Sequence, residues 1–233
     1  MTGIGPSVWC GLRKGSEKLG ADVLQEEMEV AGWPEFPWLT ILFQPRKTIR
    51  AIVDSDENRY VILLVILFGI AYGLGNAVNR SYGDVMSGPA ALIFAAIAGP
   101  VGALIGWLVG GAFFRWTGSW FGGVATTEEV RTAMAWSGVP TIATLPIWLV
   151  MLMYYGLELF YSADTPQIDR HPSLLLIGGI LITIFTIWWY FLFWKCFAEV
   201  QRLSLIKSFA AIAIPFVVLV GIFVGCGLLT SIG

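Results

Sequence analysis

The sequence predicts an all-α membrane protein whose helices cross the bilayer five times. Apolar residues make up 57% of its 233 residues and charged residues only 13%, with a mean hydropathy of +0.75, whereas soluble domains carry about 25% charged residues. The few charges bound five long apolar windows, and twelve of the 14 Lys and Arg residues fall on one side of the predicted spans. These observations indicate a polytopic membrane protein with a defined orientation.

Each predicted span is a window almost free of charge, because a Lys, Arg or Asp at mid-bilayer costs roughly 2.5 to 3.5 kcal/mol and about 20 apolar residues cross the hydrocarbon. The windows place helices near residues 60–79, 90–114, 136–159, 173–195 and 208–230. Prolines and glycines within them predict kinked, glycine-rich helices. We therefore expect residues 36–233 to form one membrane domain behind a cytoplasmic tail of residues 1–35.

The positive charges predict the orientation. With a cytoplasmic N-terminus, the outer loops carry only Arg80 and Arg170, as the enrichment of Lys and Arg in cytoplasmic loops requires. The C-terminus then lies outside. Six tryptophans fall near the proposed inner interface, namely Trp116, Trp120, Trp136, Trp188, Trp189 and Trp194.

An amphipathic segment precedes the first span. Pro45 suits the first turn of a helix, where its missing N–H is no loss, and Ile49 and Ile52 then share one face. Upstream, FPWLTILF supplies an apolar anchor. We predict that residues 36–53 lie along the inner leaflet.

Three cations in this segment are candidate contacts for lipid headgroups or a partner: Arg46, Lys47 and Arg50. Each would contribute about 1 kcal/mol near an anionic surface. Two other interpretations stay open. The cations could serve only to orient the chain, or they could pair with the acidic run DSDE at residues 54–57.

A second cytoplasmic element begins at TTEEVRTAMAW. Thr126 and Glu129 have the spacing of a capping box, which predicts a helix start. This helix runs toward the third span, and Pro140 should kink it at the membrane.

The order of these motifs resembles the Ypt/Rab-interacting protein (Yip) domain family, in particular its bacterial branch. The resemblance rests on PRKTIR, a glycine-rich second span, and the GG-x-A-T segment (residues 122–126) leading to Pro140. It implies five spans, a cytoplasmic N-terminus and a bacterial inner membrane location. Eukaryotic relatives bind Rab GTPases, but the nearest match to their motif, DVMSGP at residues 84–89, lies on the outer side here, so Rab binding is not carried over.

The sequence lacks the usual patterns of catalysis and metal binding. Its cysteines, Cys10, Cys196 and Cys226, are far apart, and His171 is its single histidine, so no metal site is expected. Nucleophile-elbow, HExxH and P-loop patterns are also missing. We expect no enzyme activity, no cofactor and, from the net charge of -2, no nucleic-acid partner.

Two polar residues within the spans form a candidate intramembrane site, Asn76 and Glu158. Asn76 would pack against a neighbouring helix through its amide, or be solvated at the outer interface. Glu158 lies near the outer end of its span and is expected to reach water.

The second span repeats small residues every four positions, at Ala98, Gly102, Gly106 and Gly110. Such a ridge lets another helix approach closely. The favoured partner is a helix of the same bundle, as for the pair Gly69 and Gly73 in span one, and the alternative is a second subunit.

Together these features predict a non-enzymatic protein that organises the membrane or scaffolds partners through its cytoplasmic face. Its expected partners are membrane lipids, anionic lipids among them, and other membrane proteins or further copies of itself. The alternative is a small-solute transporter or channel subunit with a polar path through Asn76, Thr141 and Thr144, and the lack of charge at membrane depth disfavours it.

Overall fold

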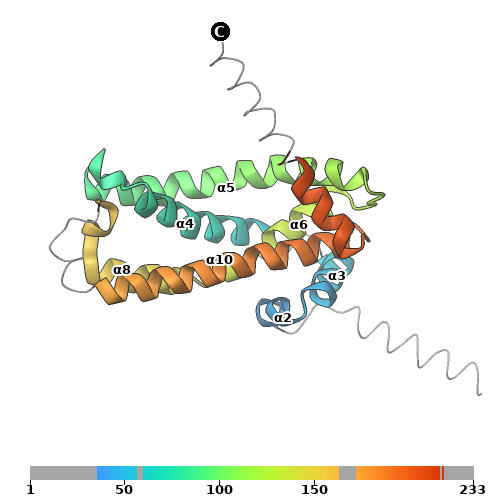
Figure 1. The fold of residues 1–233 in the computed structure, drawn as a ribbon, viewed down its shortest axis with the longest axis horizontal. Coiled ribbons are helices and arrows are strands. Elements are labelled where there is room, and N and C mark those ends of the chain that lie inside the picture. Colours follow the sequence, from blue (N-terminus) through green and yellow to red (C-terminus); the bar gives the residue numbers. More distant parts are fainter. Residues whose placement is uncertain (1–35, 57–59, 163–171, 216, 218–233) are drawn as a thin grey trace, which may run out of the picture.

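The computed structural model describes residues 36–56, 60–162, 172–215 and 217, and every regular element in these ranges is a helix. Four long apolar segments lie lengthwise beside one another in an elongated bundle (Figure 1). They are α4 (Val61–Asn79), α5 (Gly88–Ser119), the stretch Thr127–Phe160 and α10 (Pro172–Val200). Each is long and apolar enough to cross a bilayer, so the chain is a multi-pass membrane protein.

The two ends of the bundle differ in construction. At one end, here called the α3 end, lie α2 (Pro37–Phe43), α3 (Pro45–Asp56), α6 (Thr127–Ser137) and an apolar helix, Leu205–Pro215 (Figure 1). The opposite end, here called the η2 end, carries the two 3-10 turns η1 (Tyr82–Asp84) and η2 (Gly156–Phe160).

The first, second and fourth predicted spans correspond to α4, α5 and α10, and the last two helices extend beyond the expected boundaries. The fifth predicted span, 208–230, begins within helix Leu205–Pro215. Its remainder lies outside the described residues, apart from residue 217, and so does the tail 1–35. The fifth crossing therefore stays a prediction.

The third span is a broken rod. After α6 come α7 (Val139–Ile142) and α8 (Leu145–Tyr155), which continue into η2. Pro140 and Pro146 lie in the first turns of α7 and α8, where a missing N–H breaks no helical hydrogen bond. The predicted break at Pro140 is confirmed.

Two glycines of α4 allow it to pack directly on the backbone of α5. A Cβ atom at Gly69 would lie 2.5 Å from the Cα of Pro100, and one at Gly73 would collide with the carbonyl oxygen of Ala95. Gly99 in turn has room only for hydrogen, because the carbonyl oxygen of Gly69 lies against it. The predicted small-residue packing in span one is confirmed, and α5 is its partner.

The predicted ridge on α5 is a different case. A Cβ at Gly102 or Gly106 would meet nothing within 4 Å in the described part of the chain, whereas one at Gly110 would meet the Met134 side chain. In the described part of the chain, therefore, no helix packs on Gly102 or Gly106, and packing of these two glycines inside the bundle stays a prediction. Helix α4 packs on the neighbouring row of α5, through Ala95 and Gly99, and leaves part of the predicted row open.

The buried apolar residues form one cluster toward each end. The cluster at the α3 end surrounds Trp136 and Phe197 and takes in Ile49 and Ile52 of α3. The other, toward the η2 end, includes Trp148, Tyr155 and Phe160. The wide lipid-facing surfaces of α5 and α10 contribute little to either cluster.

The α4–α5 contact predicts the effect of one methyl group. Gly73→Ala should lower the stability of the purified protein by roughly 1 to 3 kcal/mol, because overpacking forces two backbones apart. Thermal unfolding in detergent would measure it. Gly106→Ala is the matched control, since its Cβ meets open space, and equal melting temperatures for the two variants would contradict the packing described.

Candidate functional site

Helix α3 lies across the α3 end of the bundle and is held there by its apolar face. Ile49 and Ile52 are 0% exposed and belong to the same cluster as Phe197 and Val200 of α10. Its amphipathic pattern is as predicted, but this face packs on protein and not on lipid. In the preceding helix α2, Leu39 and Phe43 stay exposed, so the apolar surface of the segment that lipid can reach is on α2.

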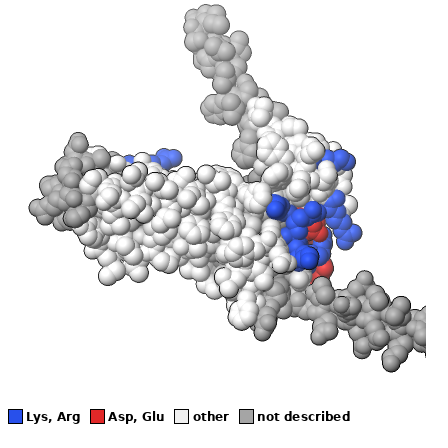
Figure 2. Space-filling view, turned by 60° about the horizontal axis from the view of Figure 1, so that its bottom comes forward, with Lys and Arg blue, Asp and Glu red and all other residues white. Residues whose placement is uncertain are grey.

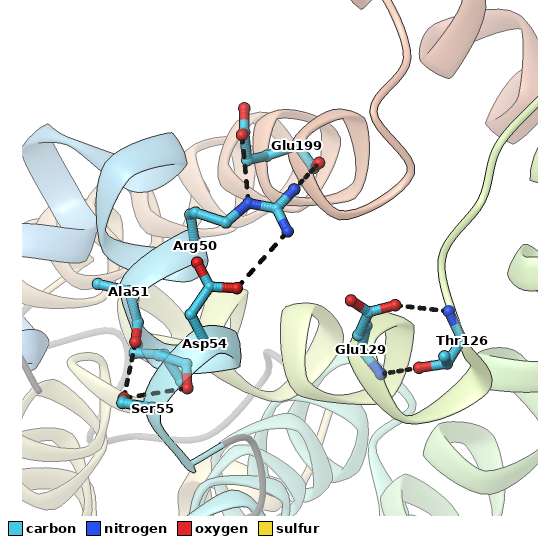
Figure 3. Close-up of polar contacts among 8 residues, drawn as sticks. Arg50, Ala51, Asp54, Ser55, Thr126, Glu129 and Glu199 are labelled. Carbon is cyan, nitrogen blue, oxygen red and sulfur yellow. Dashed lines mark hydrogen bonds and ion pairs between the residues drawn. The ribbon is translucent and has the colours of Figure 1, made fainter. Parts of the chain in front are cut away.

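Glu199, in the last turn of α10, binds two of the three candidate cations. The Nε atom of Arg46 donates to its Oε2 at 2.7 Å, and the Nε of Arg50 lies 3.6 Å from its Oε1. Arg50 also donates to the carbonyl oxygen of Glu199 at 2.8 Å and lies 3.9 Å from Asp54 (Figure 3). Because hydrogen bonds between charged groups are the strong ones, Glu199 anchors α3 on α10.

This pairing changes the interpretation of the cationic stretch. Arg46 and Arg50 are engaged inside the molecule, and Arg50 with Asp54 makes one of the pairs that the acidic run suggested. Lys47 is exposed and forms no ion pair with any described residue. Sequence reasoning missed Glu199, because 153 positions separate it from Arg46 and no local pattern links them.

Gln201 makes a second connection, which the sequence did not suggest. Its side chain is among the largest fully buried ones, and its Oε1 accepts a hydrogen bond from the N–H of Ala125 at 3.2 Å. A Cβ at Gly118 or Gly123 would collide with this amide. Gly118 at the end of α5 and Gly123 of the GG-x-A-T segment thus make room for Gln201, which ties the α5–α6 connection to the end of α10.

The α5–α6 connection is ordered by its own residues as well. Gly122 has φ +86°, a conformation that glycine adopts without strain. The Thr126 side chain accepts from the N–H of Glu129 at 3.1 Å, and the Glu129 carboxylate accepts from the N–H of Thr126 at 2.6 Å (Figure 3). The predicted capping box is confirmed.

Positive charge gathers over the α3 end, as Figure 2 shows, while the long sides of the bundle carry almost none on the face drawn. At the α3 end, four exposed cations without an ion pair among the described residues define what we call the cationic face: Lys47, Arg115, Arg202 and Lys207. Phe43, four residues before Lys47, is 75% exposed, and Trp116 and Trp120, which follow Arg115, are also exposed. Basic and aromatic side chains together are typical of a surface at the lipid headgroups.

The two candidate intramembrane residues both lie toward the η2 end. The amide of Asn76 donates to the carbonyl oxygen of Tyr72, within its own helix, at 3.0 Å. Glu158 lies in η2, and its Oε2 is buried without a hydrogen bond from any described residue. Thr144 donates to the carbonyl oxygen of Thr141, whereas the hydroxyl of Thr141 is buried without a hydrogen-bond partner among the described residues. Asn76 and Thr144 therefore bond locally, and no hydrogen bond among the described residues links them.

No constellation for catalysis or metal binding appears in the described ranges. Cys196 is buried with its sulfur 4.0 Å from the carbonyl oxygen of Pro45. No three His, Cys, Asp or Glu residues of the described part lie close enough together to hold a metal ion.

Comparison with known proteins identifies a family for most of this architecture. The family model described as Yip1 domain matches residues 39–227, which include most of α2, all of α3, the four long apolar segments, Glu199 and Gln201. No curated protein and no solved structure matches the chain.

Glu199→Gln should loosen α3, because the neutral amide loses both ion pairs while the main-chain bond to Arg50 remains. We expect amide hydrogen exchange in residues 45–56 to quicken roughly fivefold, in keeping with about 1 kcal/mol for partly exposed pairs. Lys47→Gln is the matched control, since Lys47 pairs with no described residue. Unchanged exchange in Glu199→Gln would show that the ion pairs do not hold α3.

Proposed function

The chain belongs to the Yip1 domain family, and on that premise we propose that it is a non-enzymatic protein that organises the membrane through its α3 end. The cationic face collects anionic lipids around the protein. The same face, with α2 and the α5–α6 connection, offers a folded surface on which partner proteins assemble.

One observation supports this proposal above the others: α3, the α5–α6 connection and the last turn of α10 are joined into one surface. Glu199 holds α3, and Gln201 holds the connection that follows α5. Arg46 and Arg50 form the ion pairs of this attachment, while the four residues of the cationic face remain exposed. A preorganised basic surface binds lipid headgroups without the entropy cost of ordering a loose segment.

The absence of catalytic patterns in the sequence favours a non-enzymatic role over an enzymatic one. Of the polar groups named for the transport alternative, Asn76 and Thr144 donate to main-chain carbonyl oxygens within one turn of the same chain segment, and the Thr141 hydroxyl is buried without a partner among the described residues. A transport path needs polar or ionisable groups facing a shared passage, so these contacts favour membrane organisation.

The orientation belongs to the same proposal. The cationic face lies at the α3 end, and the positive-inside rule assigns that end to the cytoplasm. In a bacterium it would face the inner leaflet of the inner membrane.

Energy transfer from tryptophan to dansyl-labelled lipids tests lipid collection. Liposomes of phosphatidylcholine with 30% phosphatidylglycerol are compared with dansyl on either lipid, using Trp148→Phe protein so that this donor toward the η2 end is removed. We expect roughly twofold or greater enrichment of phosphatidylglycerol, because each cation contributes about 1 kcal/mol. Replacing Lys47, Arg115, Arg202 and Lys207 by Gln should abolish the enrichment, and 0.5 M salt should weaken it by screening.

Arg80→Gln is the control, since Arg80 lies at the other end of α4. Enrichment that survives in the fourfold Gln variant, or that is absent from the starting protein, would contradict lipid collection by the cationic face.

Cysteine labelling in intact cells tests the orientation. In a chain whose Cys10, Cys196 and Cys226 are replaced by Ala, Ser87→Cys should react with a membrane-impermeant maleimide. Val124→Cys, exposed in the α5–α6 connection, should react only after lysis. Labelling of Val124→Cys in intact cells would reverse the proposed topology.

A further inference from the structure

A groove of about 380 Å³ opens between α4 and α5 toward the η2 end of the bundle. Two rows of residues at i, i+4 spacing line it: Tyr72, Asn76 and Arg80 from the α4 side, and Phe94, Ala98 and Gly102 from α5. The groove exists because α4 packs against Ala95 and Gly99 of α5, while the adjacent row of α5 carries the small residues Ala98 and Gly102, which do not fill the space beside α4. A Cβ at Gly102 would meet nothing within 4 Å.

The dimensions of the groove match one leaflet. Each lining row runs over nine residues, whose eight steps of about 1.5 Å cover about 12 Å, and half of the roughly 30 Å hydrocarbon core is about 15 Å. Arg80 follows the last residue of α4 as its C-cap, so it lies at the interfacial end of the groove. Asn76 is one turn deeper, and Gly102 marks the apolar end.

Arg80 is a cation without a counter-charge in the described chain. Its side chain is exposed, and no described acid lies within 4 Å of its nitrogens. Among the described residues, the acids in the two 3-10 turns of this end are Asp84 and Glu158. Asp84 accepts a hydrogen bond from the N–H of Ser162 at 3.1 Å, and the buried Oε2 of Glu158 meets no described partner.

An apolar trough with a cation at its interfacial end fits a molecule that joins a hydrocarbon chain to an anion. We propose that this groove binds an anionic phospholipid, with its phosphate on Arg80 and one acyl chain along Ala98 and Gly102. Arginine pairs with phosphate through several charge-assisted hydrogen bonds. The Asn76 amide, one turn below, lies at the depth of the lipid's ester groups. This site is independent of the cationic face, which is at the opposite end.

A second copy of the chain is the main competing occupant, because small residues every four positions also allow helices to pair. The two occupants make different demands on Gly106. Gly106 continues the open row but does not line the groove. A helix packed along the row would contact both glycines, whereas the lipid chain occupies only the part at Gly102.

Native mass spectrometry of the full-length protein in detergent tests the proposal, with dioleoyl phosphatidylglycerol and dioleoyl phosphatidylcholine as probes. All proteins carry the four Gln substitutions in the cationic face, so lipid bound at the α3 end does not contribute. The variants are Arg80→Gln, Gly102→Leu to fill the groove, and Gly106→Leu as the matched control. Both glycines face open space in the described chain, so these changes should leave the fold intact.

We expect one phosphatidylglycerol to bind in preference to phosphatidylcholine. Arg80→Gln and Gly102→Leu should each weaken its binding about tenfold, the change produced by about 1.4 kcal/mol, while Gly106→Leu should bind as the parent does. This pattern would support the groove as a lipid site even if the cationic face collected no lipid.

Several results would overturn the proposal. Equal binding of the two lipids, or unchanged binding in Arg80→Gln, would exclude recognition of the anion. Unchanged binding in Gly102→Leu, or full displacement by millimolar glycerol phosphate, would exclude the acyl chain from the groove. Loss of a dimer in both leucine variants would assign the open row to a second copy of the chain.

Discussion

The polar last turn of α10 is the feature on which the rest of the α3 end depends. Glu199 binds two arginines of α3, and Gln201, two positions later, accepts from the N–H of Ala125. Segments from three distant parts of the chain therefore meet at one helix end. The partners of the Glu199 carboxylate and the buried Gln201 amide also fix the positions of the segments that carry them, because separating those segments would leave these polar groups unpaired at a cost in free energy.

The attachment also explains how a basic stretch becomes a defined surface. Arg46 and Arg50 form ion pairs with Glu199. The unpaired positive charge exposed at this end therefore comes from Lys47 and from cations on other segments. Apolar residues Ile49 and Ile52 turn inward at the same time. The apolar face of α3, which the sequence predicted to lie on the inner leaflet, instead packs into the protein core, and α2 carries the exposed Leu39 and Phe43.

Helix α5 uses small residues for two opposite purposes. At Ala95 and Gly99 they let the backbone of α4 approach to contact distance, whereas at Gly102 they leave a groove beside Arg80. The difference comes from which face of α5 is turned toward α4: the row with Ala95 and Gly99 contacts α4, and the row with Gly102 does not. The same orientation of α5 thus produces both the close packing and the open groove. Substitutions in the packed row should change stability, and substitutions in the open row should change lipid binding.

Local and semi-local patterns in the sequence determined the class of this protein and the positions of its main elements. Hydropathy over about 20 residues predicted the spans that α4, α5 and α10 form, and the Thr126–Glu129 box and Pro140 predicted a helix start and a break. These signals act within a few turns, so no knowledge of packing was needed. Only the tertiary structure decided that Arg46 and Arg50 bind Glu199, that Gln201 orders the glycine segment, and that α4 packs on Gly99 instead of Gly102. The physical reason is that such contacts depend on how helices rotate against one another and on residues up to 153 positions apart, which no local pattern encodes.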